Sequence, residues 1–281
     1  TSGYFQPTER NIRAKFAKSW GVPEEKLSLE PGFKLTDLPH GVKEGKIHAF
    51  YNFGEDPLQT EPDSADMKET LQNCDFVISQ DIFMTQTTAY ADVVFPGTSW
   101  GEHDGVFSAS DRTFQRFTAA VPPKGECKHD WQIFSELSTR MGYPMHYENT
   151  KEIWDEVREN CPSFYGATYE KMEGVGHAQW PIPTLECPGT PTLFKGGKFN
   201  KPDGKARLLA ADFVVPTELP DDEYPLVLCT VREVGHYSCR SMTGNCKVLS
   251  LLADEPGFVN INPADAEARG IAQDDLVFVK S

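Results

Sequence analysis

The chain has 281 residues, of which 39% are hydrophobic and 25% are charged, so it is long enough for one large domain or two. Its formal net charge of −15 argues against a nucleic-acid-binding protein and against attachment to an anionic membrane surface, because both need a basic face. No apolar run approaches the roughly 20 residues that a membrane-spanning helix needs, so we expect no direct insertion into a membrane.

The N-terminal part of the chain predicts alternating helices and strands. Apolar side chains at helical spacing mark the helices, and short apolar runs bounded by turn residues mark the strands. The expected helices cover residues 9–20 and 64–73, and the expected strands cover residues 46–53, 75–79 and 92–95. Ser64 is the expected N-cap of the second helix. Strand, helix and strand at this spacing are typical of βαβ units and a parallel sheet.

Ligands bind at the carboxyl ends of the strands in sheets of this kind. Gly54–Pro57 and Gln80–Asp81 lie directly after two of the expected strands. A short helix is expected over 85–91, with Thr85 or Gln86 as its cap, and its N-terminus would favour phosphate. No Gly-x-Gly-x-x-Gly motif and no P-loop is present, which argues against an ordinary NAD site or ATP site.

The middle of the chain predicts two further helices, over residues 130–140 and 150–160. Residues 162–203 are rich in Pro, Gly and Lys, and we expect them to form a long surface excursion or linker. A strand over 204–215 and a linker over 216–220 are expected to follow.

A second unit is expected to begin near Asp221. Its expected strands cover residues 226–230, 258–261 and 275–280. A short helix is expected before the last strand, because Asn262 can serve as its N-cap, Pro263 as its first residue and Gly270 as its stop. Several strands with one short helix are typical of a small β-barrel.

The loop Val231–Asn245 gathers many different hydrogen-bonding side chains after an expected strand. Arginine suits phosphate, tyrosine and histidine suit stacking or hydrogen bonding, and glycine allows close approach of the backbone. The set comprises Arg232, Glu233, His236, Tyr237, Ser238 and Arg240, with Gly235 at the bend. A polyanionic ligand that carries a ring would need such a set, whereas an ordinary polar surface loop is the alternative.

The seven cysteines are odd in number and include no Cys-x-x-Cys pair, which disfavours a disulfide framework or a zinc site. A three-thiolate metal site at Cys229, Cys239 and Cys246 is a further alternative, although their spacings are wide. Buried, reduced thiols in a cytoplasmic protein are the simpler interpretation.

The loop Val231–Asn245 resembles the pterin-contacting loop of the molybdopterin-dependent formate dehydrogenases. Three more stretches resemble that family in the same order, namely Asn52–Thr60, Ser79–Phe117 and His129–Tyr147. The resemblance covers nearly the whole chain. It implies an α/β fold: a parallel-sheet dinucleotide-binding domain over 1–220, then the start of a double-psi β-barrel domain, incomplete, over 221–281.

The resemblance also implies a cofactor and a reaction. The cofactor would be bis-molybdopterin guanine dinucleotide with molybdenum or tungsten, and the reaction would be the oxidation of formate to CO2. An iron–sulfur electron-transfer subunit is the expected partner. The family carries its iron–sulfur cysteines and its catalytic selenocysteine or cysteine upstream, so we interpret this chain as a part without the reaction centre, expected to be inactive alone.

Buried carboxylates are expected at the guanine and pterin, because both rings present adjacent N–H donors that one carboxylate can accept together. The resemblance implies guanine contacts for Asp81 and Asp130. Alternatives are a helix N-cap at Asp130 and a turn acid at Asp81. The cofactor-binding residues expected are Glu55, Asp56, Gln80, Asp81, Thr85, Asp130, Arg232, Glu233, Gly235, His236, Tyr237 and Ser238, with no catalytic residue and no metal ligand.

Two other charged groups have interpretations that do not involve the cofactor. Glu102, His103 and Asp104 are adjacent on a loop, where side chains diverge, so a shared metal ion is disfavoured. Arg112 and Arg116 face either a phosphate or some of the 42 acidic residues, and we favour the acids.

Three other functions compete with a formate dehydrogenase. The chain could be part of another molybdopterin oxidoreductase, such as a nitrate reductase, or a non-catalytic module that keeps the cofactor fold. A hydrolase finds no support, because neither a Gly-x-Ser-x-Gly nor a His-Glu-x-x-His motif is present.

Overall fold

The computed structural model describes residues 5–6, 8–173, 176–231, 235–236, 238–252 and 257–280. The chain forms two compact units, Thr1–Ala206 and Arg207–Ser281. The domain boundary expected between residues 220 and 221 therefore falls inside the second unit, and it stays a prediction. None of the helices among the described residues is long and apolar enough to cross a membrane.

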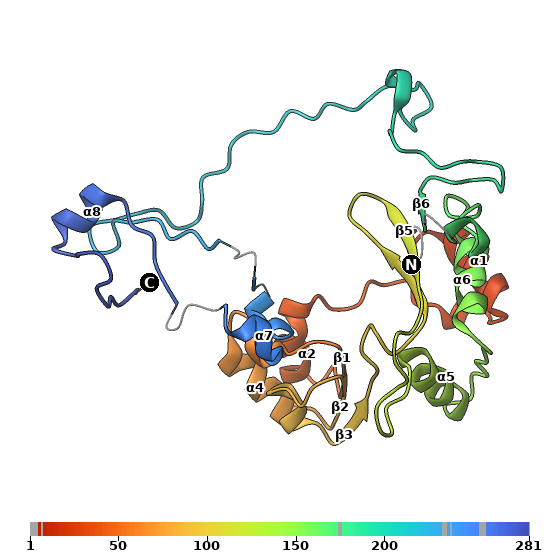
Figure 1. Ribbon diagram of the computed structural model, residues 1–281, viewed down its shortest axis with the longest axis horizontal. Helices are drawn as coiled ribbons and strands as arrows, with labels where there is room; N and C mark the ends of the chain where they lie inside the picture. The colour runs from red at the N-terminus through yellow and green to blue at the C-terminus, as the bar shows by residue number, and fades with distance from the viewer. Residues whose placement is uncertain are drawn as a thin grey trace. The chain divides into compact units, whose positions relative to one another are not determined.

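The N-terminal unit mixes helices with two small sheets (Figure 1). Its α-helices are α1 (Arg10–Trp20), α2 (Leu38–Lys43), α3 (Pro57–Thr60), α4 (Ser64–Asn73), α5 (Asp130–Arg140) and α6 (Thr150–Asn160). Its strands are β1 (Ala49–Phe53), β2 (Phe76–Asp81), β3 (Val93–Pro96), β4 (Gly105–Ser108), β5 (Thr113–Phe117) and β6 (His177–Gln179). Its 3-10 helices are η2 (Glu24–Lys26), η3 (Leu35–Asp37), η4 (Thr87–Tyr90), η5 (Glu170–Met172) and η6 (Lys195–Gly197).

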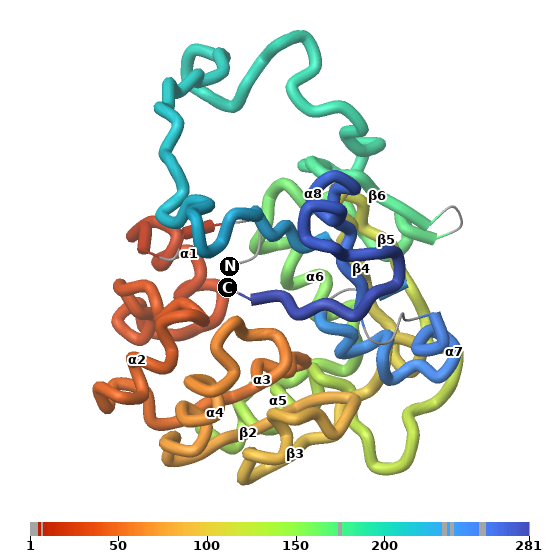
Figure 2. Tube along the Cα trace, turned by 90° about the vertical axis from the view of Figure 1, so that its left-hand side faces the viewer, coloured from red at the N-terminus to blue at the C-terminus, as the bar shows by residue number. Residues whose placement is uncertain are grey.

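The first sheet is parallel, with the strand order β1-β2-β3, as the βαβ pattern predicts. In Figure 2 the helices α3 and α4 lie next to β2 and β3. Met67 and Leu71 of α4 pack on Val77 of β2 and bury all three side chains. Asp63 is the N-cap of α4, since its Oδ1 accepts from the N–H of Asp66 at 2.9 Å, so the expectation of a cap at Ser64 is wrong.

The second sheet is antiparallel, with the order β4-β5-β6, and it holds a core of its own. Phe114 of β5 meets Cys161, Met172 and Ile182 in this core, and Ile182 is fully buried. Residues 162–173 and 176–182 therefore contribute to packed structure, and the expectation of a surface excursion is wrong there. Proline and glycine content misled the prediction, because apolar residues between them supply the core.

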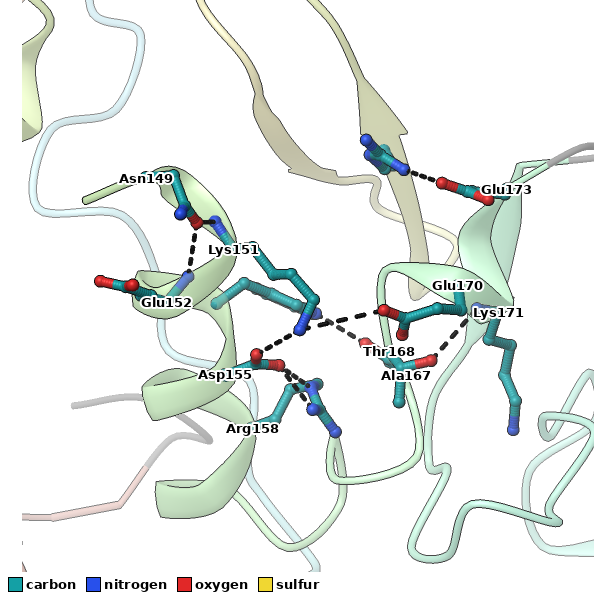
Figure 3. Close-up of polar contacts among 12 residues, drawn as sticks. Asn149, Lys151, Glu152, Asp155, Arg158, Ala167, Thr168, Glu170, Lys171 and Glu173 are labelled. Carbon is teal, nitrogen blue, oxygen red and sulfur yellow. Dashed lines mark hydrogen bonds and ion pairs between the residues drawn. The ribbon is translucent and has the colours of Figure 1, made fainter. Parts of the chain in front are cut away.

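A network of polar contacts ties this segment to α6 (Figure 3). Lys151 lies between two acids, with its Nζ 2.7 Å from an oxygen of Asp155 and 3.9 Å from one of Glu170. The indole of Trp154 donates to the carbonyl of Ala167 at 2.6 Å. These contacts fix residues 167–170 against the helix, which positions β6 beside β5.

The C-terminal unit contains short helices only, among the residues that the structure describes. They are η7 (Ser238–Arg240), η8 (Thr243–Asn245), α7 (Lys247–Ser250) and α8 (Pro263–Ala268). The prediction of α8 is confirmed, since Oδ1 of Asn262 accepts from the N–H of Ala264 at 2.9 Å. The described residues form no strand over the expected ranges 204–215, 226–230, 258–261 and 275–280. A strand needs a neighbouring segment that completes a ladder of backbone hydrogen bonds.

Candidate functional site

The three strands of the parallel sheet have their carboxyl ends at the same edge, and the polar residues Gln80 and Asp81 lie there at the end of β2. Gln80 lies opposite Phe53 of β1 and Phe95 of β3. The loops that follow are tied to the same edge, because the N–H of Gly54 donates to the carbonyl of Gln80 at 2.9 Å, and that of Gly97 to the carbonyl of Asp81 at 3.1 Å. The candidate site is this edge.

Gln80 joins the sheet to α5 through its side-chain amide. It is completely buried, and its Nε2 donates to Oδ1 of Asp130 at 2.7 Å. Its Oε1 accepts a hydrogen bond from the hydroxyl of Tyr51. The structure thus brings the predicted residues Gln80 and Asp130 into contact and adds Tyr51, which the sequence interpretation missed. Strand alternation offered a signal, since Tyr51 lies two residues before Phe53, the neighbour of Gln80 in the sheet.

Asp130 does not cap its helix. The N-cap of α5 is His129, whose N–H donates to the side chain of Gln132 at 3.2 Å, and Asp130 is the first helical residue. The alternative that Asp130 serves as the N-cap is therefore wrong, and its carboxylate is directed toward Gln80. A Cβ on Gly97 would come within 2.7 Å of Oδ1 of Asp130, so this close approach needs a glycine at the end of β3.

Asp81 lies at the end of β2, where burial raises the pKa of its carboxyl group above the ordinary value. Hydrogen bonds from the N–H groups of Phe83 and Ile82 oppose that rise, whereas the charges of Asp56 and Asp130 add to it. Its Oδ1 accepts from the N–H of Phe83 at 2.9 Å. The strand end therefore concentrates carboxylate acceptors, a setting that favours a ligand with N–H donors.

Asp56 is occupied by the protein itself. Its carboxylate is buried, and Oδ1 accepts from the N–H of Thr87 at 3.0 Å and from the Thr87 hydroxyl at 2.7 Å. Thr85 and Thr88 hydrogen-bond each other reciprocally at the start of η4, where the short helix over 85–91 was expected. Glu55 is exposed. The expected ligand contacts of these residues stay predictions.

The acidic cluster Glu102–Asp104 stabilises backbone turns. Glu102 accepts from the N–H groups of Ser99 at 2.8 Å and Lys124 at 3.0 Å, and Asp104 accepts from that of Ala119 at 2.6 Å. The three residues line a shallow hollow of about 380 Å³ with His129. Within the described part of the chain, no three Cys, His, Asp or Glu side chains are grouped so that they could hold a metal ion.

Arg112 and Arg116 fix the second sheet. Arg116 forms an ion pair with Glu173 and lies 4.8 Å from the ring centroid of Tyr169, so the preference for an acidic partner is correct there. Arg112 instead donates to the carbonyl groups of Trp180, Thr190 and Pro191, a role that neither alternative anticipated.

The polar loop of the C-terminal unit is described in part. Arg232, Glu233 and Tyr237 lie outside the described residues. Gly235 lies beside Leu252, which a Cβ there would meet at an ordinary 3.8 Å.

His236 is buried within this loop. Its Nδ1 is 2.7 Å from the hydroxyl of Thr243, whereas Nε2 has no hydrogen-bond partner among the described residues. A buried ring nitrogen of this kind fits a loop that faces a ligand.

The exposure of the cysteines contradicts part of the expectation of buried thiols. Cys161 is buried, but Cys229, Cys239 and Cys246 are exposed, so buried thiols are not the rule in the C-terminal unit. Exposure follows from the lack of a packed sheet around them.

Comparisons with known proteins match both parts of the chain. Residues 6–140 match the family described as Molybdopterin oxidoreductase, and residues 226–281 match the Molydopterin dinucleotide binding domain. The chain is 54% identical to formate dehydrogenase H of Escherichia coli (strain K12), over 99% of this chain and 39% of that protein. It is 36% identical to the F420-dependent formate dehydrogenase 1 subunit alpha of Methanococcus maripaludis, over 95% of this chain and 39% of that protein.

A solved structure shares the fold. Acetylene hydratase from Pelobacter acetylenicus superposes with a TM-score of 0.62 at 21% identity, over 93% of this chain and 38% of that one. At this identity the likeness concerns the fold alone. The chain spans 39% of the length of the two formate dehydrogenases named above.

Proposed function

We propose that this chain, which carries part of a molybdopterin oxidoreductase domain and a molydopterin dinucleotide-binding region, is the dinucleotide-binding portion of a formate dehydrogenase catalytic subunit. The longer protein would oxidise formate to CO2 and pass two electrons to an iron–sulfur partner subunit. The iron–sulfur cluster and the catalytic selenocysteine or cysteine would belong to the remainder of that protein, because no cysteine of this chain is followed directly by histidine.

The observation that carries the proposal is the contact between Gln80 and Asp130 at the edge of the parallel sheet. One oxygen of Asp130 is held by Gln80, and the same oxygen lies 2.7 Å from the place of a Cβ on Gly97, so the carboxylate is packed closely against the end of the strand. A carboxylate held in this way suits guanine, whose ring N–H and exocyclic amine lie side by side. The residues present therefore fit the guanine end of the cofactor.

Further contacts with the cofactor are proposed for each unit taken by itself. Asp81 would accept a further N–H donor beside Asp130, and the loop around His236 would meet the pterin or phosphate, with Arg232 as its cation. When bound, the cofactor supplies a molybdenum or tungsten centre that accepts the electrons of formate. The protein residues named here bind and orient it, and none of them is assigned a catalytic role.

The C-terminal unit would form a double-psi β-barrel within the longer protein. The apolar runs over 226–230, 258–261 and 275–280 are exposed in this structure, and strands of this kind become stable only with hydrogen-bonded neighbours. We infer that the barrel begins at residue 221, as the sequence predicts.

The proposal is tested with an Asp130→Asn variant of the chain, prepared with the cofactor present. Asparagine replaces one acceptor by a donor, so the side chain loses the ability to accept both N–H groups of guanine. Binding is expected to weaken by roughly 1–3 kcal/mol, the cost of a buried donor without a partner. The measurement is the guanine nucleotide released from purified protein on denaturation.

The matched control is Asp63→Asn, which keeps the N-cap of α4 because asparagine and aspartate cap about equally well. This control is expected to retain the wild-type amount of nucleotide. Wild-type nucleotide content in Asp130→Asn would show that the carboxylate does not recognise guanine. The same preparations are expected to show no formate-dependent dye reduction, since the reaction centre lies outside this chain.

A further inference from the structure

We propose that Tyr51 is a positioning residue, which sets the orientation of the Asp130 carboxylate for recognition of a guanine base. The inference rests on the function proposed above. Tyr51 belongs to β1 and Asp130 to α5, and the side chain of Gln80 forms a hydrogen bond with each of them.

The side-chain amide of Gln80 has a donor end, Nε2, and an acceptor end, Oε1. In the observed orientation Nε2 donates to Oδ1 of Asp130 at 2.7 Å, while Oε1 accepts from the Tyr51 hydroxyl. If the amide were turned over, Oε1 would face the carboxylate, and two acceptors would meet in a buried place. An ionised Asp130 therefore requires the observed orientation of the amide.

The hydroxyl of Tyr51 anchors the amide in that orientation. A phenol hydroxyl that donates to Oε1 satisfies the only acceptor of the Gln80 side chain, which is completely buried. Without that donor, Oε1 would be buried without a partner, and the amide would be free to shift from the position in which Nε2 meets the Asp130 carboxylate. The hydroxyl of Tyr51 thus acts on Asp130 without touching it.

Two features keep the Tyr51 hydroxyl in place as a donor. Its ring stacks on that of Phe134 in α5, with centroids 5.6 Å apart, so the helix that carries Asp130 also fixes the tyrosine. Burial, and then the charge of Asp130, raise the pKa of Tyr51 above its ordinary value, so the phenol keeps its proton. The remaining oxygen of Asp130 can then face the ligand in one fixed direction.

The test compares two nucleotides that differ at the recognised group. Inosine diphosphate lacks the exocyclic amine of guanosine diphosphate, so the ratio of their dissociation constants reports how well the carboxylate is aligned. Calorimetric titration of the 281-residue chain supplies both constants. Tyr51→Phe is expected to lower the preference for guanosine diphosphate by about tenfold, because the lost hydrogen bond frees the amide of Gln80.

The matched control is Tyr147→Phe. The Tyr147 hydroxyl also donates to a side chain, that of Glu156 in α6 at 2.6 Å, and neither residue belongs to the parallel sheet or to α5. Both variants lose one hydrogen bond, so both lose some thermal stability, and only Tyr51→Phe is expected to change the nucleotide preference. A preference within twofold of wild type in Tyr51→Phe overturns the positioning role.

The Asp130→Asn variant separates this inference from the proposed function. If Asp130→Asn loses the preference and Tyr51→Phe keeps it, the guanine site stands and the role of Tyr51 is wrong. If both variants keep the wild-type preference, or if the wild-type chain binds neither nucleotide, both the guanine site and the role of Tyr51 are contradicted.

Discussion

At the scale of single residues, the site is a series of side chains that fix one another. Tyr51 holds Gln80, Gln80 holds Asp130, and Gly97 leaves room for the carboxylate. Gln80 and Asp81 were expected at a ligand site because they follow a strand, and the family resemblance implied guanine contacts for Asp81 and Asp130; as ligand contacts all three stay predictions. The sequence did not predict Tyr51 or Gly97, whose importance depends on contacts between residues far apart in the chain.

The surroundings of His129, the residue before Asp130, shift the pKa of its imidazole. Burial, and then the charge of His103, lower the pKa of His129 below its ordinary value, while Asp104, Asp130 and Glu102 oppose the change. Its Nδ1 lies 3.2 Å from the hydroxyl of Thr98, which is also 3.4 Å from Nδ1 of His103. The folded state therefore favours a neutral His129.

We expect this histidine to make the fold less stable in mild acid. When the pKa of a histidine is lower in the folded state, the unfolded chain binds more protons than the folded one. The histidine's contribution to folding stability is therefore present above the unfolded pKa of about 6.5 and is lost as pH falls through the folded pKa. His129→Gln should narrow the difference in melting temperature between about pH 7.5 and about pH 5.5. The exposed pair His48–Asp75 supplies the control variant, His48→Gln, and an equal narrowing there would contradict the assignment.

At the scale of elements, local patterns predicted what local interactions stabilise. The helices α1, α4, α5, α6 and α8 appear where the sequence predicted them, because helical turns involve neighbours in sequence, although the N-caps of α4 and α5 are Asp63 and His129. The strands of the parallel sheet were found for a related reason, since short apolar runs bounded by turn residues are distinctive. The strands expected in the C-terminal unit are absent from the residues described there, because a strand is stable only with hydrogen-bonded neighbours.

Asp56 shows how an element can be held by one buried acid. Its carboxylate accepts both the N–H and the hydroxyl of Thr87, so it fastens η4 to the end of β1. Asp56→Ala is expected to lower the free energy of unfolding by about 1–3 kcal/mol, because two buried donors lose their partner. Asp56→Asn keeps an acceptor for both donors and should retain most of that stability. Chemical denaturation of the two variants decides the point, and equal losses would show that the negative charge, rather than the acceptor, is what matters.

At the scale of the whole molecule, the chain divides into a unit with packed cores and a unit without a completed sheet. The N-terminal unit has one core around Met67 and Leu71 and another around Phe114 and Ile182. The C-terminal unit leaves large apolar side chains exposed, including Leu208 at 95% and Phe278 at 96%. Burial on this scale decides which unit persists alone, since exposed apolar strands contribute little to stability.

Limited proteolysis should therefore cut the chain first near the boundary of the two units. Residues 205–216 contain no helix or strand and are exposed, and segments of this kind admit a protease readily. Trypsin is expected to cleave first after Lys205 or Arg207, and a glutamate-specific protease after Glu218 or Glu223. The N-terminal product should resist further digestion, because its backbone is tied into two sheets and the packed helices around them.

Mass spectrometry of the early products identifies the cut sites. Early cuts between residues 57 and 117, inside the parallel sheet or the hairpin that follows it, would show that the N-terminal unit does not hold its fold, and the site built on Gln80 and Asp130 would then need the remainder of the longer protein to form.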